Sequence, residues 1–486
     1  MDIFFKIKSK KSQFILSFIA AIIYQLGYEI VLTSGSFTVY FLSYIHYEQD
    51  WVDMNYGNLM RPVVLLFLAF FAPLSGPMEH FFGPRISMIV SSVILEIGFV
   101  SLYFQRNLWL FYSLTFLLGI GIGLSTQLLV KNTCHYYPKR KGLISALISS
   151  ICALFGSSFA FLGEFVINPE RKQLSQGSTY YESEIAERSR LYFLFAMILI
   201  PISAIISVFL LYKYDPSCEE DVNIQENIKG PILIGNIEEE NTPDEDKPDT
   251  RVSNSFSKPT SKHNIKKALK NFRFWRNILI VGAMPFIIWF ESSTSRPYSA
   301  MIGVDGKILG VLSGTMSILG CITNPILAFC VDKFGFRLTM TIISSLTIAL
   351  SIYFFFFMDS PLFYVIGLYI SSTLRGGIIS SLVPHLMEIY GLRYFLVLGG
   401  LGRLFTQLFS FSAAGVSIVI SIFRKGPKEL LLPYRITSLV GVGFGIFGLI
   451  LVLYENDEKF EFDDENNLEN GSQEKENNSK EQEREK

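Results

Sequence analysis

Long apolar segments alternate with shorter polar ones along almost the entire chain. Twelve of them meet or approach the roughly 20 residues with which an α-helix crosses the hydrocarbon core of a bilayer. Segments such as 354–357 are apolar on every side, without the period-2 alternation of a membrane β-barrel. We therefore expect helices, because a helix satisfies its backbone hydrogen bonds within one segment. The expected spans lie near residues 14–44, 58–79, 86–105, 108–130, 143–166, 190–213, 275–297, 308–330, 338–358, 361–388, 395–422 and 436–454.

A polar stretch from Asp215 to Thr260 divides these spans into six and six. It is rich in Glu, Asp, Asn and Pro, so it cannot bury enough apolar area to order itself, and the same holds for the end of the chain. The sequence thus predicts an all-α integral membrane protein with twelve transmembrane helices in two six-helix, pseudo-symmetric halves. The expected parts are an N-terminal arm (1–13), an N-terminal half (14–213), a disordered linker (214–273), a C-terminal half (274–454) and a disordered tail (455–486).

The distribution of Lys and Arg predicts how the chain is oriented. The N-terminal arm carries four lysines, whereas the first loop on the other side, 46–57, carries neither Lys nor Arg. Because cytoplasmic loops carry the excess of basic residues, we expect both termini and the linker to face the cytoplasm. The pattern does not distinguish a plasma membrane from an organelle membrane.

The composition excludes several classes of protein. Half of the residues are hydrophobic and 17% are charged, below the roughly 25% of a soluble domain. The net charge of −1 gives no basic field for a nucleic acid. The five cysteines and five histidines show no metal-ligand spacing, and no nucleophile has a base in a catalytic pattern. We expect neither a metal, a cofactor nor an enzymatic activity.

A short motif occurs at the same place in each half. Gly76-Pro-Met-Glu-His-Phe-Phe-Gly-Pro-Arg85 follows the second expected span, and Ala328-Phe-Cys-Val-Asp-Lys-Phe-Gly-Phe-Arg337 follows the eighth. An acidic residue, a glycine turn and an arginine suit a tight loop that holds adjacent helices by charge. Internal repeats of this kind mark secondary transporters, whose site lies near the midplane between the halves. The candidate residues of this conformational latch are Gly76, Glu79, Gly83, Arg85, Asp332, Lys333, Gly335 and Arg337.

The latch motifs resemble those of the major facilitator superfamily, in which this loop reads G-x-x-x-D-R-x-G-R. The second copy keeps the acidic and basic residues, whereas the first has Glu79-His80 where Asp-Arg is usual. A further signature, Gly119-Ile-Gly-Ile-Gly123 followed by Tyr137-Pro-Lys-Arg-Lys-Gly142, narrows the match. It resembles the oxalate/formate antiporter and monocarboxylate-porter branch, whose loop between spans four and five reads W-F-P-x-R-R-G. The resemblance implies transport of a small organic anion by alternating access.

Two arginines near the middle of expected spans are candidates for substrate contact. An ionisable group at this depth costs a few kcal/mol, and the guanidinium groups of Arg375 and Arg403 suit bidentate binding of a carboxylate. The resembling branch uses basic residues in its C-terminal half for anionic substrates. The alternative is that each arginine forms a structural pair with a buried Glu. Tyr24 and Gln127 add hydrogen-bonding groups that serve either a substrate or helix packing.

Two buried acids, Glu29 and Glu291, lie in the first and seventh expected spans, which correspond under the repeat. Burial favours the protonated form of a carboxylate, so either residue is a candidate for proton coupling. Pairing with an arginine would instead keep it ionised and structural. The eighth span has no Lys or Arg between Gly310 and Cys330. Because the resembling branch places a basic residue there, a monocarboxylate is favoured over a dicarboxylate.

We therefore expect a monomeric secondary transporter of a small organic anion, working by proton symport or by exchange, with the lipid bilayer as its surroundings. One alternative is an amino-acid transporter of the same fold, in which Glu29 or Glu291 would bind the ammonium group. A different class is a membrane sensor or scaffold that signals through a cytoplasmic partner of the linker. Deleting the linker and the tail discriminates these, because a transporter keeps most of its flux.

Overall fold

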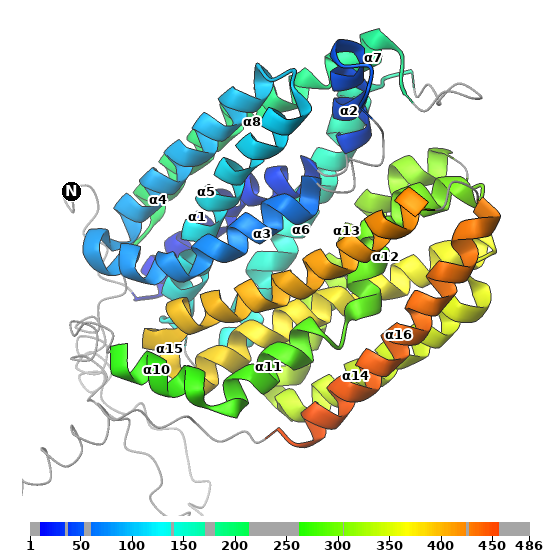
Figure 1. Ribbon diagram of the computed structural model, residues 1–486. Coiled ribbons are helices and arrows are strands. Elements are labelled where there is room, and N and C mark those ends of the chain that lie inside the picture. The colour runs from blue at the N-terminus through cyan, green and yellow to red at the C-terminus, as the bar shows by residue number, and fades with distance from the viewer. Residues whose placement is uncertain are drawn as a thin grey trace, which may run out of the picture.

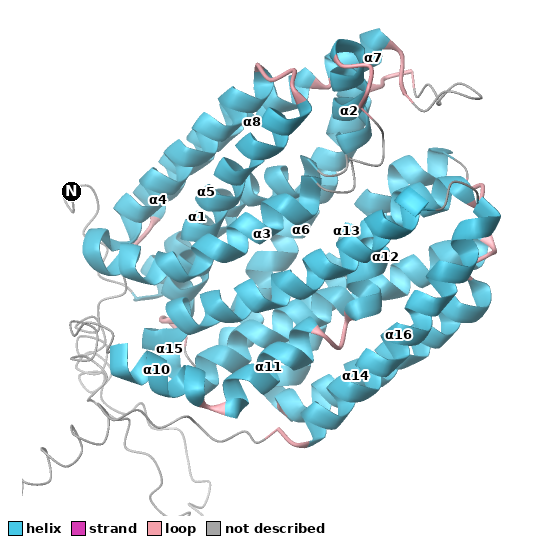
Figure 2. Cartoon of the chain, viewed as in Figure 1, coloured by secondary structure: helices cyan, strands magenta, loops and turns pink. Residues whose placement is uncertain are grey.

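The computed structural model describes residues 10–34, 37–52, 60–137, 140–170, 180–212, 262–304, 306–423 and 427–455. These ranges are helical and contain no strand (Figure 2). Ten helical segments are long and apolar enough to cross a membrane, and a pair bent by 44° makes an eleventh crossing. One of the ten, Pro62–Tyr103, has 42 residues and would be about 63 Å long if straight, twice the roughly 30 Å hydrocarbon core. Because it turns at Gly83, it contains two crossings, which gives the twelve that the sequence predicted.

The two halves lie side by side as bundles of similar size (Figure 1). The helices of the N-terminal half are α1 (Lys10–Ser34), α2 (Thr38–Glu48), α3 (Met60–Phe71), η3 (Ala72–Leu74), α4 (Ser75–Tyr103), α5 (Leu108–Cys134), α6 (Lys141–Ile167), α7 (Ser183–Arg188) and α8 (Arg190–Leu210). Those of the C-terminal half are α10 (Lys262–Lys270), α11 (Phe272–Gly282), α12 (Phe286–Met301), α13 (Gly306–Phe334), α14 (Phe336–Phe357), α15 (Pro361–Phe423) and α16 (Pro427–Leu453).

Three of the four described glycines with positive φ lie at turns between spans and are followed by the same residue pattern. Gly83 has φ 76°, Gly335 has φ 83° and Gly391 has φ 68°, a region that glycine reaches without the steric cost of a side chain. Gly83 divides α4 into two spans, and Gly391 divides α15. Each glycine is followed two positions later by an arginine, so the Gly-x-Arg element of the latch motif occurs a third time, before the eleventh span.

The first span of each half is interrupted. In the N-terminal half α1 ends at Ser34 and α2 begins at Thr38; in the C-terminal half α11 ends at Gly282 and α12 begins at Phe286. Pro285 lies in the second interruption, where its missing N–H prevents a continuous helical hydrogen-bond ladder.

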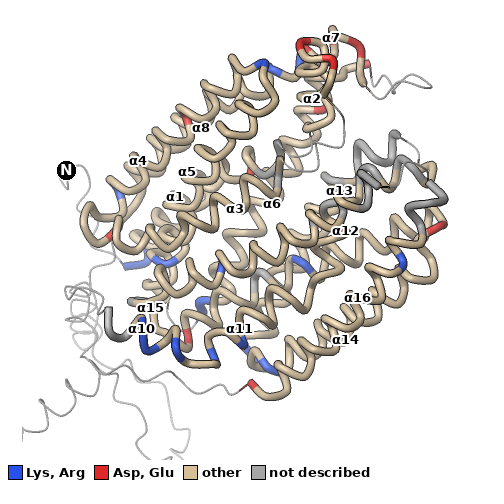
Figure 3. The backbone as a smooth tube through the Cα atoms, viewed as in Figure 1, with Lys and Arg blue, Asp and Glu red and all other residues tan. Residues whose placement is uncertain are grey.

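Among the described residues, one buried apolar cluster draws on both halves. Many Lys and Arg residues lie toward the end at which α10 lies, which we call the basic end (Figure 3). There, one buried cluster contains residues of both halves, and we call it the shared core; its members include Tyr24, Met88, Leu128, Ile144, Ile278, Leu386, Tyr390, Phe395 and Leu398. The two other buried clusters each draw on one half. The bundle is therefore closed at its basic end.

Helix α10 lies in the stretch that the sequence predicted to be a disordered linker, 214–273. Its apolar residues Ile265, Ala268 and Leu269 follow helical spacing and pack against the shared core. That burial orders a segment whose overall composition indicated disorder. Likewise α1 begins at Lys10, inside the predicted arm 1–13. The remainder of the linker and the tail from residue 456 onward lie outside the described residues.

Candidate functional site

Arg403 lies where the two halves meet. Gly400, one turn earlier, packs on the other half so closely that an added Cβ would stand 2.6 Å from the backbone of Pro73. Residues three, four and seven positions apart share a helix face, so Arg403 and Gln407 continue the face that Gly400 turns toward the N-terminal half. The Arg403 Nη1 and Gln407 Oε1 atoms are both buried without a hydrogen-bond partner among the described residues.

Arg375, on the first span of α15, joins three elements of the C-terminal half. Its Nη1 donates a hydrogen bond to Ser292 Oγ of α12 at 2.8 Å. The next residue, Gly376, lies against Asn324 of α13, where an added Cβ would overlap the side-chain oxygen of Asn324. That oxygen is buried and has no hydrogen-bond partner within the described ranges. Arg375 is thus held by α12, and the residue next to it packs on a buried polar side chain of α13.

Tyr24 and Gln127 belong to different surroundings in the N-terminal half. The Tyr24 hydroxyl donates to the Met88 carbonyl oxygen and accepts from Ser92 Oγ, both at 3.2 Å, so it is engaged with α4. Gln127 on α5 is buried, and its Oε1 lacks a partner in the part of the chain described. A small pocket lies between α1, α4 and α5; its lining residues are Tyr24, Gln25, Tyr28, Leu95, Ile122, Ser125 and Thr126.

Glu29 and Glu291 occupy different positions in their halves. Glu29 precedes the interruption between α1 and α2, whereas Glu291 follows the one between α11 and α12, so the correspondence expected from the repeat is not observed. Glu29 lies against α6, where an added Cβ on Gly156 would stand 2.7 Å from Glu29 Oε2. Glu291 is fully buried, and its Oε2 accepts a hydrogen bond from the Tyr364 hydroxyl at 2.6 Å.

The second latch motif connects the halves at the basic end. Asp332 Oδ2 accepts a hydrogen bond from the backbone N–H of Leu143 at 3.0 Å, in the first turn of α6. Gly142 leaves room for this carboxylate, because a Cβ there would overlap it. An anion at a helix N-terminus is stabilised by the unpaired N–H groups and the helix dipole. The exposed ammonium group of Lys333 lies over the Phe334 ring, 5.3 Å from its centre, while Gly335 supplies the turn and Arg337 is exposed.

The first latch motif makes its polar contacts within its own half. Glu79 Oε2 pairs with Lys131 Nζ of α5 at 2.6 Å. Arg85 donates from Nε and Nη2 to the Leu211 carbonyl oxygen, at 3.1 and 2.9 Å, and so caps the end of α8. Aligning the two copies on their positive-φ glycines places His80, not Glu79, opposite Asp332, and His80 is exposed. The first motif reaches the other half through Gly76, which packs on Val397 and Leu396.

His135 is a titratable residue at the end of α5, near Lys131 and Lys141. Burial and the positive charges of Lys131 and Lys141 lower the pKa of His135 to about 3. The imidazole is therefore neutral near pH 7, and it adds no positive charge to the basic end.

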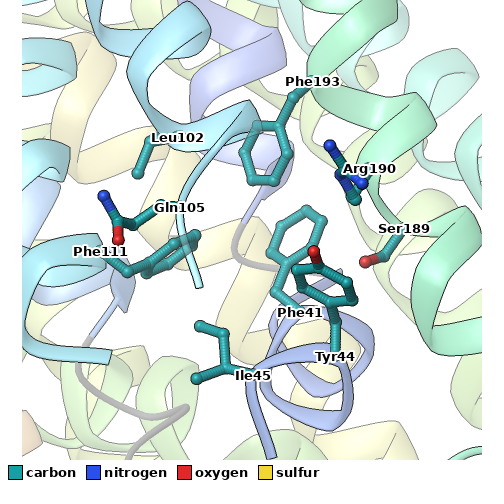
Figure 4. Close-up of a pocket in the computed structure, with 9 residues that line it drawn as sticks. All are labelled: Phe41, Tyr44, Ile45, Leu102, Gln105, Phe111, Ser189, Arg190 and Phe193. Carbon is teal, nitrogen blue, oxygen red and sulfur yellow. The ribbon is translucent and has the colours of Figure 1, made fainter. Parts of the chain in front are cut away.

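A second pocket lies near the opposite end of the N-terminal half (Figure 4). Its lining residues are Phe41, Tyr44, Ile45, Leu102, Gln105, Phe111, Ser189, Arg190 and Phe193. The Arg190 guanidinium is engaged nearby: it lies over the Tyr103 ring, 4.5 Å from its centre, and its Nε donates to the Tyr103 carbonyl oxygen. Because all lining residues belong to one half, this pocket is not at the boundary where alternating access would operate.

The structure thus brings together part of the expected site. Arg375 bonds to Ser292, which is next to Glu291 in α12. Arg403 lies on the helix face that packs on the other half through Gly400. Tyr24 and Glu29 face the interior of the N-terminal half. Sequence reasoning missed Asn324 and Gln407. Each is an amide in an apolar span, and this could have identified them from the sequence. Gln407 also lies one turn after Arg403.

Comparisons with known proteins agree with this architecture. The sequence profile of the Major Facilitator Superfamily matches residues 14–393. A solved structure of the "MFS (major facilitator superfamily) proton:xylose symporter XylE bound to 6-bromo-6-deoxy-D-glucose" aligns with a TM-score of 0.57 and 15% identity, covering 90% of this chain and 94% of that one. At this identity the likeness shows the fold alone. A comparison with curated protein sequences finds no match. Because the profile spans more than three quarters of its length, the chain belongs to the Major Facilitator Superfamily.

Proposed function

We propose that this secondary transporter carries a small organic anion, a monocarboxylate, and that Arg403 binds the carboxylate. Membership in the superfamily makes the chain a multi-pass membrane transporter that works by alternating access. One observation carries the choice of an anion: the boundary between the halves holds a guanidinium whose buried Nη1 has no partner among the described residues.

The chemistry of the two residues at the boundary supports a carboxylate ligand. An unpaired buried cation is costly, so a site that lacks an anionic partner from the protein is completed by an anionic ligand. A guanidinium binds the two oxygens of a carboxylate through parallel hydrogen bonds. The neighbouring Gln407 carries both an amide donor and an acceptor, which suits a hydroxyl or carbonyl group on the same ligand.

The number of cations favours one carboxylate over two. The eighth span carries no Lys or Arg between Gly310 and Cys330, and Arg375 donates to Ser292. A dicarboxylate would require a second counter-charge at the boundary. The resemblance of 119–123 and 137–142 to the oxalate/formate and monocarboxylate-porter branch supports the same class of substrate.

The orientation of the bundle follows from its charges. We assign the basic end to the cytoplasm, because Lys and Arg are enriched in cytoplasmic loops. The closed shared core then lies on the cytoplasmic side, and the structure corresponds to an outward-facing state of a monomer. In this state Arg403 would meet substrate that arrives from outside.

Uptake and counterflow of labelled lactate, formate and oxalate into proteoliposomes test the proposal. We expect saturable counterflow of a monocarboxylate that Arg403→Ala abolishes and Arg403→Lys reduces, since lysine keeps the charge but not the bidentate geometry. The control is Arg106→Ala, whose side chain is exposed and pairs with Glu48 at 2.9 Å, far from the boundary. Transport of an amino acid, without transport of lactate, formate or oxalate, would instead assign Arg403 a structural role. Loss of all function on removing the linker and tail would indicate a sensor.

A further inference from the structure

We propose that Glu291 is the proton-binding group that couples this transporter to a proton gradient, and that it is loaded from the end opposite the basic end along a line of tyrosines. The proposal rests on the proposed function, because a coupled proton requires a transported substrate. It goes further by naming the coupling ion, its binding atom and its route.

The surroundings of Glu291 hold no counter-charge for an ionised carboxylate. The side chain is 0% exposed. Its Oε2 accepts one hydrogen bond from Tyr364, and its Oε1 has no partner among the described residues. No Lys, Arg or His of the described ranges lies within ion-pair distance of it. An ionised carboxylate without a partner is far more costly to bury than the neutral acid. Glu291 therefore holds a proton in this state.

Three buried tyrosines in ring contact lead from Glu291 to the neighbour of Arg435. The ring of Tyr364 packs against that of Tyr298, with centres 4.9 Å apart, and Tyr298 stacks on Tyr434 at 4.5 Å. The Tyr298 hydroxyl donates to the Met358 carbonyl oxygen at 3.4 Å. Tyrosine hydroxyls both donate and accept hydrogen bonds, so a row of them can pass a proton with intervening water. These residues come from α12, α15 and α16, which enclose Glu291.

The outer end of this row is an exposed ion pair. Arg435, next to Tyr434, pairs through Nη2 with Asp359 Oδ2 at 2.5 Å, and both side chains reach solvent. Tyr298 contacts both Tyr364, which bonds to Glu291, and Tyr434, the neighbour of Arg435, so it lies between the ion pair and the buried acid in this series of contacts. Asp359 is therefore a surface carboxylate from which a proton can enter the row.

On its other side Glu291 adjoins the candidate substrate site. Ser292, the next residue, accepts the hydrogen bond from Arg375 Nη1. Arg375, which bonds to this adjacent residue, is a cation that could balance an ionised Glu291 once the halves move. The titratable or charged groups facing Glu291 are thus Tyr298 on α12, Tyr364 and Arg375 on α15, Tyr434 and Arg435 on α16, and Asp359 after α14; the Arg296 side chain lies outside the description.

The step conserves charge. In the outward-facing state a carboxylate oxygen of Glu291 takes one proton from external water through the tyrosines and becomes neutral. After the basic end opens, the acid O–H bond breaks, the proton passes to cytoplasmic water, and the carboxylate remains beside Arg375. One proton then accompanies one monocarboxylate, so the combined movement carries no net charge.

Glu291→Gln in proteoliposomes tests the coupling separately from transport. We expect this variant to keep counterflow within about twofold and to lose accumulation driven by a pH gradient. The matched control is Glu164→Gln, because Glu164 also accepts a hydrogen bond from a tyrosine, Tyr40, at 2.5 Å but lies in the other half. Accumulation by Glu291→Gln equal to that of the wild type would overturn the proposal. Counterflow lost in Arg403→Ala and kept in Glu291→Gln would support both proposals.

A spectroscopic readout tests the proton without any substrate. We expect the purified protein to show an infrared band of a protonated carboxyl that Glu291→Gln removes and Glu164→Gln does not. Tyr364→Phe keeps the acid but removes its hydrogen bond, so the band should shift to higher frequency while the protein remains folded. A spectrum in which Glu291→Gln removes an ionised carboxylate band instead would refute the proton site, whether or not the chain transports an organic anion.

Discussion

Replacing Asp332 should open the basic end of the bundle. The carboxylate accepts the Leu143 N–H at 3.0 Å across the boundary between the halves. An exposed anion at a helix N-terminus contributes about 0.3–1 kcal/mol, and losing a capping acceptor costs about 1 kcal/mol. For Asp332→Ala we therefore expect a loss of about 1 kcal/mol, which shifts the equilibrium between closed and open forms about fivefold. Asp332→Asn keeps an acceptor oxygen and loses the charge, so about 0.5 kcal/mol and about twofold are expected.

Cys134 provides a built-in reporter for this shift. Its thiol is fully buried in the shared core, and its Sγ lies 3.7 Å from the Lys141 carbonyl oxygen. With the other cysteines replaced by serine, alkylation of Cys134 by a maleimide should accelerate about fivefold in Asp332→Ala and about twofold in Asp332→Asn. The control is Glu184→Ala, which removes a surface acid that pairs with Arg188 at the other end. Equal alkylation rates in all variants, with unchanged melting temperatures, would show that the inter-half cap does not hold the basic end closed.

Three further predictions concern stability. Glu455→Ala should lower the free energy of unfolding by about 3–5 kcal/mol, measured by thermal unfolding, because this fully buried carboxylate pairs with two arginines that would lose their counter-charge; truncation after Glu455 should leave the melting temperature unchanged. Gly123→Ala should cost about 1–3 kcal/mol, since its Cβ would stand 2.5 Å from the Leu68 carbonyl oxygen, whereas Gly320→Ala, with open space around it, should be neutral. Stability should fall as the pH drops from about 6.5 toward 3, because His135 binds a proton in the unfolded chain before it does in the folded one; His135→Gln should reduce that slope in urea titrations.

The twelve crossings could be predicted because their cause is local. A bilayer requires about 20 apolar residues in a row, and that length can be read from the chain without knowing any partner. The latch motifs were visible for a similar reason, since Gly83 and Gly335 impose a turn that a side chain would disfavour. Helix α10 was missed because its order comes from packing on the shared core, which composition does not reveal.

The site was predicted less completely because it depends on which helix faces meet. Arg403 could be named from its depth, but its place on the helix face toward the other half follows from the packing of Gly400, one turn earlier, on Pro73. Gln407 is a candidate for ligand binding only because it lies on the same helix face as Gly400 and Arg403. The register of the first latch motif was also misjudged: Glu79 was compared with the acidic position, whereas the turn glycines place His80 there. The depth of a residue in the membrane can be read from its position in the sequence. The direction in which its side chain faces depends on how the helices pack.

The shared core has a consequence for how the protein could be assembled. Since its members come from both halves and pack as one cluster, the two bundles adhere to each other without help from the covalent connection between them. Burial of apolar side chains does not depend on whether the peptides are linked. Fragments 1–212 and 262–486, produced together as separate polypeptides, should therefore recognise each other and form a complete carrier, with the intervening residues free to vary in length.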